Sequence, residues 1–179
     1  YLQAIEQTDD GLQLTAPDFE LTTDLVISSA GRIPNADQLG LENVGVTFNR
    51  HGIQVNDRLQ TANPHIYAIG DVSDTPVPKL TPVAGYEARY LVQQLTQPGA
   101  AITYPVIPTQ VFAVPKLAQV GLSATDAADQ PDKYRVNTLD MTKWFSYYRF
   151  GARQAQAKVI IDQASGQVVG ATLLSYVAD

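Results

Sequence analysis

Short apolar segments separated by turn residues fill the first part of the chain. Leu12–Leu14 and Phe19–Leu21 alternate apolar and polar residues on either side of a Pro-Asp turn, which predicts two half-buried strands. Asp24–Ser28 and His65–Asp71 are continuous apolar runs, typical of strands buried on both faces of a parallel sheet. Ile53–Val55, which follows a His-Gly turn, predicts a further short strand.

One long helix is predicted after the Pro-rich residues 74–80. Thr81 is expected to be its N-cap and Pro82 its first helical residue, where the missing N–H breaks no hydrogen bond. Apolar residues then recur at helical spacing as far as Leu95, and Pro98–Gly99 is expected to end the helix.

After Tyr104 the pattern changes to short strands joined by turns. Ser123–Gln130 predicts a short helix with a capping box at its start. The predicted strands are Val111–Val114, Leu117–Gly121, Tyr134–Leu139, Ala157–Asp162 and Val168–Leu174, the last two forming a hairpin. We therefore expect a separate, mostly antiparallel unit here.

Composition excludes several classes of function. Twelve basic against 18 acidic residues give a net charge of −6 without a basic run, which disfavours nucleic-acid binding and contact with an anionic membrane surface. The absence of cysteine excludes a disulfide framework, a thiolate zinc site and a cysteine nucleophile within these residues. No signal peptide or membrane span is visible, and we expect a cytoplasmic protein.

Two features could carry chemistry. Gly70 and Asp71 end a buried run, where glycine lets a ligand approach the backbone and a carboxylate can accept hydrogen bonds from sugar hydroxyls. Leu80, Thr81 and Pro82 open the helix, whose free N–H groups and dipole favour an anion or an electron-rich ring atom. Gly-Asp alone is a common turn, and a capped helix alone is ordinary. The combination of the two is far less common.

Several segments, taken in order, resemble one enzyme family. They are Ala30–Asn35, Thr61–Asp71, Leu80–Ala84, Ile107–Phe112 and Val120–Leu122. Together they resemble the pyridine nucleotide-disulfide oxidoreductases, the family of glutathione reductase, dihydrolipoamide dehydrogenase and mercuric reductase. The Leu-Thr-Pro sequence at the helix start is most similar to the glutathione reductase branch.

This resemblance implies an α/β plus α+β fold: the end of a Rossmann-like fold with two dinucleotide-binding domains, followed by a mostly antiparallel dimerisation domain. Residues 1–33 would end the NAD(P)-binding domain, residues 34–102 would form the returning FAD-binding segment, and residues 103–179 an incomplete dimerisation domain. We expect truncation at both ends and a homodimer formed through the C-terminal domain.

The resemblance also implies roles for the residues around the flavin. Asp71 would accept hydrogen bonds from the ribityl chain of FAD, and Gly70 would leave room for it. Thr81, between Leu80 and Pro82, would bring the helix N–H groups to the flavin N1 and C2 carbonyl.

Further positions would serve the second dinucleotide and the far end of FAD. Gly31 and Arg32 would border the NAD(P)H site, and Asn35 would lie near the FAD adenosine. Gln110 departs from the family pattern, which commonly has an apolar residue beside the nicotinamide.

Much of the family's machinery is missing from these residues. There is no GxGxxG fingerprint and no redox cysteine pair, and the family's His-Glu acid/base region would fall beyond Asp179. A full member passes hydride from NAD(P)H to flavin and then electrons to a small disulfide substrate, a role in redox homeostasis. We therefore expect no catalytic residue here and no turnover from the chain alone.

Two alternatives remain open. The parent could be a related flavoprotein that reduces another acceptor, such as a metal ion or oxygen. The chain could instead be a non-enzymatic α+β module that self-associates.

Other candidates carry less weight. His51 and His65 are far apart in the sequence and lack a supporting cluster, so we expect no metal site. Asp71–Asp74 lacks the spacing of a calcium loop. Trp144–Phe150 is rich in aromatic residues and is interpreted as a strand with an adjoining loop that makes core or partner contacts.

Overall fold

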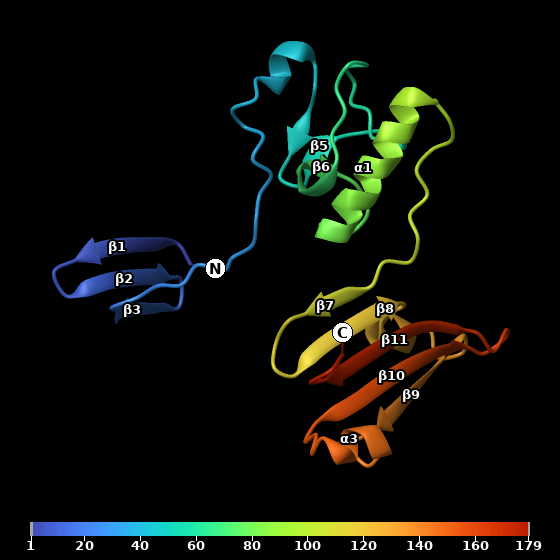
Figure 1. Ribbon diagram of the computed structural model, residues 1–179. Coiled ribbons are helices and arrows are strands. Elements are labelled where there is room, and N and C mark those ends of the chain that lie inside the picture. The colour runs from blue at the N-terminus through green and yellow to red at the C-terminus, as the bar shows by residue number, and fades with distance from the viewer. Residues whose placement is uncertain (1, 179) are drawn as a thin grey trace.

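The computed structural model describes residues 2–178. Tyr1 and Asp179, the outer limits of the first and last predicted domains, lie outside the described residues. Three units follow one another along the chain: a small antiparallel sheet, a middle unit with one long helix, and a five-stranded sheet (Figure 1).

The first unit is a three-stranded antiparallel sheet. Its strands, in spatial order, are β1 (Ala4–Thr8), β2 (Gly11–Ala16) and β3 (Phe19–Thr23). The last two confirm the predicted pair around the Pro-Asp turn. Figure 1 shows this sheet standing apart from the rest of the chain, and Phe19 and Leu21 are about half exposed (54% and 52%).

The prediction of a buried strand over Asp24–Ser28 is wrong. These residues form no strand, and Leu25 and Ile27 are 70% and 81% exposed. A strand buried on both faces needs neighbouring strands and covering layers. Within residues 2–178 no strand pairs with this segment, so its apolar side chains remain on the surface.

The middle unit holds the first compact core. Its elements are the 3-10 helices η1 (Leu41–Val44) and η2 (Gly70–Val72), the strands β4 (Phe48–Asn49), β5 (Gly52–Gln54) and β6 (Ser73–Asp74), and the helix α1 (Thr81–Thr96). β5 confirms the predicted short strand, and it pairs with β6 in parallel. Five buried residues form the core: Ala36, Leu41, Val46, Ile53 and Ala68.

The run before Gly70 is extended, but it is not the ladder strand that its apolar pattern predicted. Tyr67 makes an isolated bridge with Gln60, and the Ala68 N–H donates to the Leu59 carbonyl at 3.1 Å. As with Asp24–Ser28, the neighbours that a parallel sheet would supply are absent from the described residues.

The start of α1 also differs from the prediction. Leu80, with extended backbone angles of −130° and 146°, is the N-cap, Thr81 is already helical, and no side chain caps the helix. The Thr81 hydroxyl therefore does not take the capping role. The helix ends at Thr96, as the following Pro-Gly sequence predicted.

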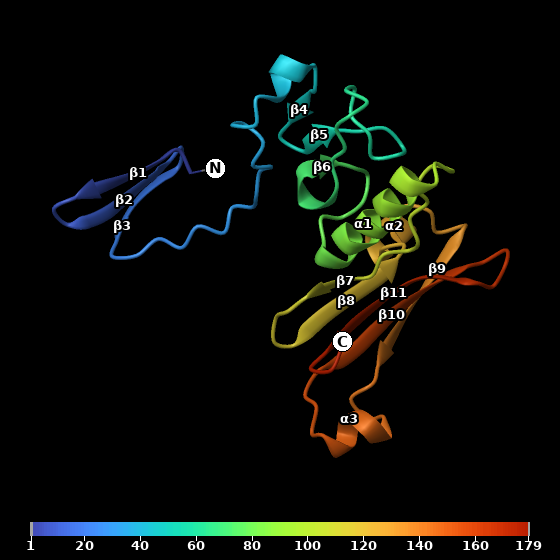
Figure 2. The ribbon, with the colours of Figure 1, turned by 45° about the horizontal axis from the view of Figure 1, so that its top comes forward.

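The C-terminal unit is a five-stranded antiparallel sheet. Its strands, in spatial order, are β7 (Thr109–Val111), β8 (Lys116–Gly121), β11 (Val168–Ser175), β10 (Ala155–Asp162) and β9 (Tyr134–Asp140). Helix α2 (Ala124–Ala128) packs on this sheet (Figure 2). The Ser123 hydroxyl accepts from the Asp126 N–H at 3.0 Å, which confirms the predicted cap, although the helix ends two residues before Gln130.

Two predictions in this unit are wrong in detail. The first strand runs over Thr109–Val111, and Phe112 and Val114 beyond it are 82% and 87% exposed. Trp144–Phe150 contains the helix α3 (Phe145–Arg149) in place of a strand. The Tyr148 N–H donates to the Trp144 carbonyl at 2.8 Å, a helical bond within the connection that joins β9 to β10. Local hydrogen bonding thus outweighs the strand preference of the aromatic residues.

Candidate functional site

A cleft of about 400 Å³ opens where the segment leading into the middle unit passes η2. It is lined by Arg32, Ile33, Pro34, Asn35, Arg50, Asp71, Val72 and Lys79. Three residues predicted from the sequence, Arg32, Asn35 and Asp71, therefore meet at one place. The volume is within the usual range for small-molecule sites.

The carboxylate of Asp71 is accessible in this cleft. Its Oδ2 lies 3.8 Å from Nη1 of Arg32, and the two side chains are 54% and 90% exposed. An exposed pair of this kind contributes about 0–1 kcal/mol. A ligand hydroxyl can therefore compete with Arg32 for the carboxylate at little energetic cost.

Gly70 brings the turn close to α1. Its φ of +69° lies in the left-handed region, and a Cβ placed on it would lie 3.1 Å from the Ala84 Cβ. A side chain is therefore disfavoured both by the backbone conformation and by the neighbouring helix. The Gly70–Asp71 turn and the first turn of α1 pack side by side as a result.

The start of α1 remains open to a ligand. Thr81 and Pro82 are exposed, Leu80 is half-buried, and within residues 2–178 no side-chain hydrogen bond caps the start of the helix. The helix dipole places about half a positive charge at this end. The missing cap, although it contradicts the prediction for Thr81, leaves these donors available.

Two basic residues of the cleft were given no role in the sequence analysis. Lys79 donates from Nζ to the carbonyls of Asp71 and Ser73, at 2.8 Å and 2.6 Å, and so fixes the loop after the turn. Arg50 reaches the cleft from the turn between β4 and β5. A lysine next to a helix start was a usable signal for the first of these residues, whereas Arg50 could be placed only by the fold.

A buried carboxylate was also missed. Glu87 on α1 is fully buried and accepts hydrogen bonds from the Gly70 N–H at 2.6 Å and the Tyr104 O–H at 2.7 Å. Burial raises the pKa of Tyr104 well above its ordinary value, and the hydrogen bond to the Glu87 carboxylate raises it further. The signal for Glu87 that was available in the sequence is its position four residues after Val83, which places it on the buried side of the helix.

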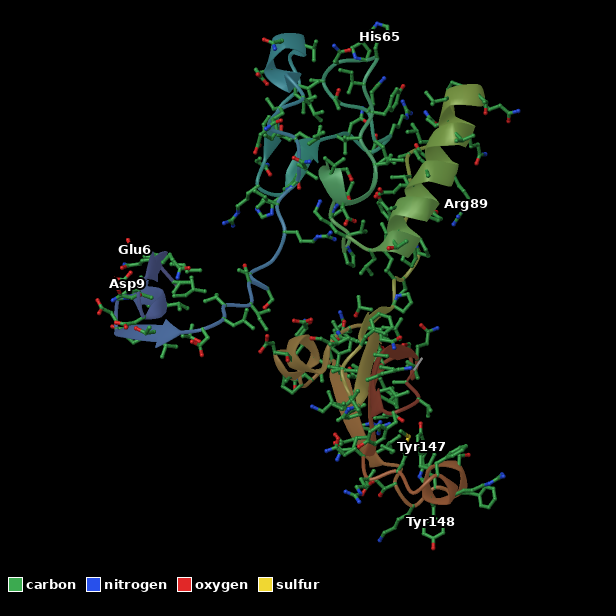
Figure 3. The ribbon with its side chains drawn as sticks, turned by 60° about the vertical axis from the view of Figure 1, so that its left-hand side comes forward. Glu6, Asp9, His65, Arg89, Tyr147 and Tyr148 are labelled. Carbon is green, nitrogen blue, oxygen red and sulfur yellow. The ribbon has the colours of Figure 1, made fainter. Side chains whose placement is uncertain are left out.

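The other predicted residues lie outside the cleft. Gly31, with a φ of +99°, is exposed one residue before the cleft lining. Gln110 lies on β7, and its Nε2 is buried without a hydrogen-bond partner among the described residues. Figure 3 shows His65 at the outer tip of the middle unit. Within residues 2–178 no group of three acidic or histidine side chains could hold a metal.

Two profiles of one protein family match the chain. The family profile described as pyridine nucleotide-disulphide oxidoreductase matches residues 2–88, and the profile of that family's dimerisation domain matches residues 107–179. The chain belongs to the pyridine nucleotide-disulphide oxidoreductase family. The resemblance drawn from the sequence is therefore confirmed, and with it the predicted fold class. Full-length members such as glutathione reductase and dihydrolipoyl dehydrogenase use FAD and NAD(P)H.

Individual relatives differ in how much of their length the chain covers. An uncharacterized 19.7 kDa protein in the mercuric resistance operon of Staphylococcus aureus is 38% identical over 143 residues, 79% of each chain. Glutathione reductase from Nostoc is 33% identical over 193 aligned positions, which cover 96% of this chain and 40% of that enzyme. The Cu(II) complex of the HOCl-induced flavoprotein disulfide reductase RclA from Escherichia coli superposes with a TM-score of 0.84 at 25% identity, over 99% of this chain and 41% of RclA.

Among residues 2–178, no helix combines the length and the apolar character needed to cross a bilayer.

Proposed function

We propose that this chain forms the C-terminal portion of an FAD-dependent NAD(P)H:disulfide oxidoreductase of the glutathione reductase type. In the parent protein, hydride would pass from NAD(P)H to flavin, and dithiol–disulfide exchange would follow. Residues 1–33 would end the NAD(P)-binding domain, residues 34–102 the FAD-binding segment, and residues 103–179 would belong to the dimerisation domain.

The observation that carries this proposal is the close packing of the Gly70–Asp71 turn against the start of α1, at the edge of the cleft. The turn that carries the Asp71 carboxylate, which can bind sugar hydroxyls, packs through Gly70 against Ala84 in the first turn of α1, whose N–H groups can bind an electron-rich ring atom. Asp71 lines the cleft, whereas Leu80, Thr81 and Pro82 lie outside its lining. FAD carries both a chain of hydroxyl groups and an electron-rich ring, so the residues present fit one side of it. They do not supply a pyrophosphate fingerprint, which fits the assignment of only part of the site to this chain.

Each residue then has a defined task. Asp71 holds the ribityl hydroxyls, Gly70 leaves room for them, and Thr81 with its flanking Leu80 and Pro82 presents the helix N–H groups to the ring. Bound FAD would supply the electron-accepting and electron-donating chemistry.

Three more residues would complete the proposed contacts of this chain. Asn35 would lie toward the adenosine of FAD, and Gly31 and Arg32 would border the NAD(P)H site. Arg32 and Asn35 line the cleft, and Gly31 precedes Arg32 directly.

The chain alone would be inactive, because it has no cysteine to exchange electrons with a disulfide. We further propose that the parent is a cytoplasmic homodimer, joined through the C-terminal sheet, that acts on a small disulfide in redox homeostasis. The match of residues 107–179 to a dimerisation domain supports this assembly.

An NMR titration of the isotope-labelled chain with FAD tests the site even if binding is weak. We expect chemical-shift changes at Asp71 and at the first turn of α1, and none at the exposed hairpin residue Ser165. An NAD(P)H oxidation assay on the same sample should show no turnover. Changes confined to other regions would contradict the proposed site. Because this chain holds only part of the FAD site, we expect it to bind FAD weakly or not at all by itself, and a tightly bound yellow chromophore in the purified chain would contradict that expectation.

A second candidate is a flavoprotein that reduces a metal ion. The name of the staphylococcal relative places it in a mercuric resistance operon, and the RclA structure was solved with Cu(II). Complementation of a strain sensitive to mercuric ion by the parent, compared with its activity on small disulfides, distinguishes the two acceptors. Light scattering tests self-association separately.

A further inference from the structure

The carboxyl group of Glu87 is the most deeply buried acidic group near the cleft, and the proposed function gives it no task. Its residue is 0% exposed. Glutamate is seldom fully buried unless it is paired, since a carboxylate without partners loses its hydration. The contacts that compensate for this loss show what the side chain does.

The two oxygens of Glu87 join three segments of the chain. Oε2 accepts from the Gly70 N–H at 2.6 Å, and Oε1 accepts from the Tyr104 O–H at 2.7 Å. The Thr75 hydroxyl lies 3.5 Å from the same Oε1. One carboxylate on α1 therefore connects the Gly-Asp turn, the loop after β6, and the segment that leads into the C-terminal sheet.

The contact with Gly70 has a directional effect. A short bond from an N–H to a carboxylate is among the stronger hydrogen bonds in proteins, and it fixes the orientation of the peptide group that donates it. This peptide group links Ile69 to Gly70, whose φ lies in the left-handed region. The next residue, Asp71, lines the cleft. The orientation of the Asp71 carboxylate therefore depends on the bond that Gly70 makes to Glu87.

The contact with Tyr104 extends this constraint to residues 100–104, which belong to the linker between α1 and the C-terminal sheet. The Tyr86 hydroxyl donates to the Thr103 carbonyl at 2.6 Å, and the Tyr90 hydroxyl donates to the Ala100 carbonyl at 2.9 Å. The rings of Tyr86 and Tyr104 lie with their centroids 6.1 Å apart. One side of α1 thus holds residues 100–104 at several points, and Glu87 is the group that also reaches the turn.

We propose that Glu87 is a positioning residue that holds the Gly70–Asp71 turn in its ligand-binding conformation and couples that turn, through Tyr104, to the linker of the C-terminal sheet. The identity of the ligand rests on the proposed function, whereas the hydrogen-bond network does not.

Two substitutions separate the geometry from the charge. Glu87→Gln keeps an oxygen that can accept from Gly70 but removes the negative charge, and Glu87→Ala removes both. Glu42→Gln, an exposed acidic residue on η1, is the matched control. Hydrogen exchange of the Gly70 amide, followed by NMR, should accelerate roughly tenfold to hundredfold in Glu87→Ala and remain near the wild-type rate in the two glutamine variants.

Titration of the Tyr104 ring supplies a readout that a purely structural role would not change. Burial raises the pKa of this phenol, and the Glu87 carboxylate raises it further. Tyr86, which lies on α1 as Glu87 does, also faces the phenol. The titration midpoint should therefore fall in Glu87→Gln even though the fold and the Gly70 bond persist. Because Glu87→Ala could fail to fold, Tyr104→Phe is a second variant, and it should also accelerate exchange at Gly70.

The FAD titration separates this inference from the proposed function. We expect the FAD-induced shift at Asp71 to decrease in Glu87→Ala and to recover in Glu87→Gln. Unchanged Gly70 exchange in both Glu87→Ala and Tyr104→Phe, or an unchanged Tyr104 midpoint in Glu87→Gln, would overturn the role of Glu87. Altered exchange together with FAD-induced shifts that fall only outside Asp71 and the first turn of α1 would support the network and reject the flavin site.

Discussion

Nη1 of Arg32 lies 3.8 Å from Oδ2 of Asp71, so a guanidinium from the segment before the middle unit faces the carboxylate of the Gly-Asp turn. Both side chains are largely exposed, and the attraction between them is therefore weak. Both side chains line the cleft, and the Asp71 carboxylate remains accessible there. A ligand with hydroxyl groups can displace Arg32 and keep the carboxylate.

Asp71→Ala should weaken FAD retention in the parent protein. The substitution removes an ionised acceptor, and hydrogen bonds to charged groups contribute about 1.5–3 kcal/mol, or roughly tenfold to a hundredfold in affinity. Flavin content after purification and a fluorescence titration measure the effect. Asp37→Ala, at an exposed position outside the cleft, is the control. Equal flavin content in both variants would show that the site is misplaced.

Gly70→Ala should destabilise the chain more than Gly166→Ala. Both glycines have a φ near +70° (69° and 72°), but a Cβ at Gly70 would lie 3.1 Å from the Ala84 Cβ, whereas nothing lies within 4 Å at Gly166. The left-handed conformation alone costs an alanine about 1–2 kcal/mol. Urea unfolding of the two variants measures the difference, and equal midpoints would contradict the packing of the turn against α1.

Thr81→Val should leave stability almost unchanged, because no side chain caps α1. Ser123→Ala should cost about 1 kcal/mol, since the Ser123 hydroxyl accepts the Asp126 N–H at the start of α2. Thermal unfolding of both variants tests this contrast. A larger loss in Thr81→Val than in Ser123→Ala would restore the capping role that the sequence predicted.

Tyr104 should make stability depend on pH in alkaline solution. Burial, followed by the hydrogen bond to Glu87, raises the pKa of its phenol above the ordinary value of 10.0. Below pH 10 the phenol keeps its proton in both the folded and the unfolded state, and its contribution to the free energy of unfolding is complete. Above it the unfolded chain ionises first, so stability falls as the pH rises. Chemical unfolding between neutral pH and pH values above 10 should show a steeper decline for wild type than for Tyr104→Phe, and parallel curves would contradict the raised pKa.

The sequence predicted the locally determined elements well. β2, β3 and β5, the long helix α1, the cap at Ser123 and the hairpin of β10 and β11 all follow from residues close to one another along the chain. Asp71 was selected from its position at the end of an apolar run, Arg32 and Asn35 were selected through the family resemblance, and the fold brings all three to one cleft. Their roles toward the dinucleotides stay predictions.

The remaining features depend on contacts that a pattern does not record. The runs over Asp24–Ser28 and His65–Asp71 have the composition of buried strands, but pairing needs neighbours that residues 2–178 do not supply. Trp144–Phe150 has strand-forming aromatic residues, yet its local hydrogen bonds make a helical turn. Glu87 lies beside the Gly70–Asp71 turn because the fold packs α1 against that turn. Arg50 reaches the same cleft from the turn between β4 and β5, and its distance along the chain gave no sign of this.

The exposed apolar segment that follows β3 leaves the junction between the first sheet and the middle unit accessible to proteases. Leu25 and Ile27 project into solvent from backbone that no sheet ladder protects. These residues belong to no helix or strand, and exposed irregular segments are preferred sites of proteolytic cleavage. Cleavage there would release the first sheet and leave all the residues that line the cleft on the larger piece.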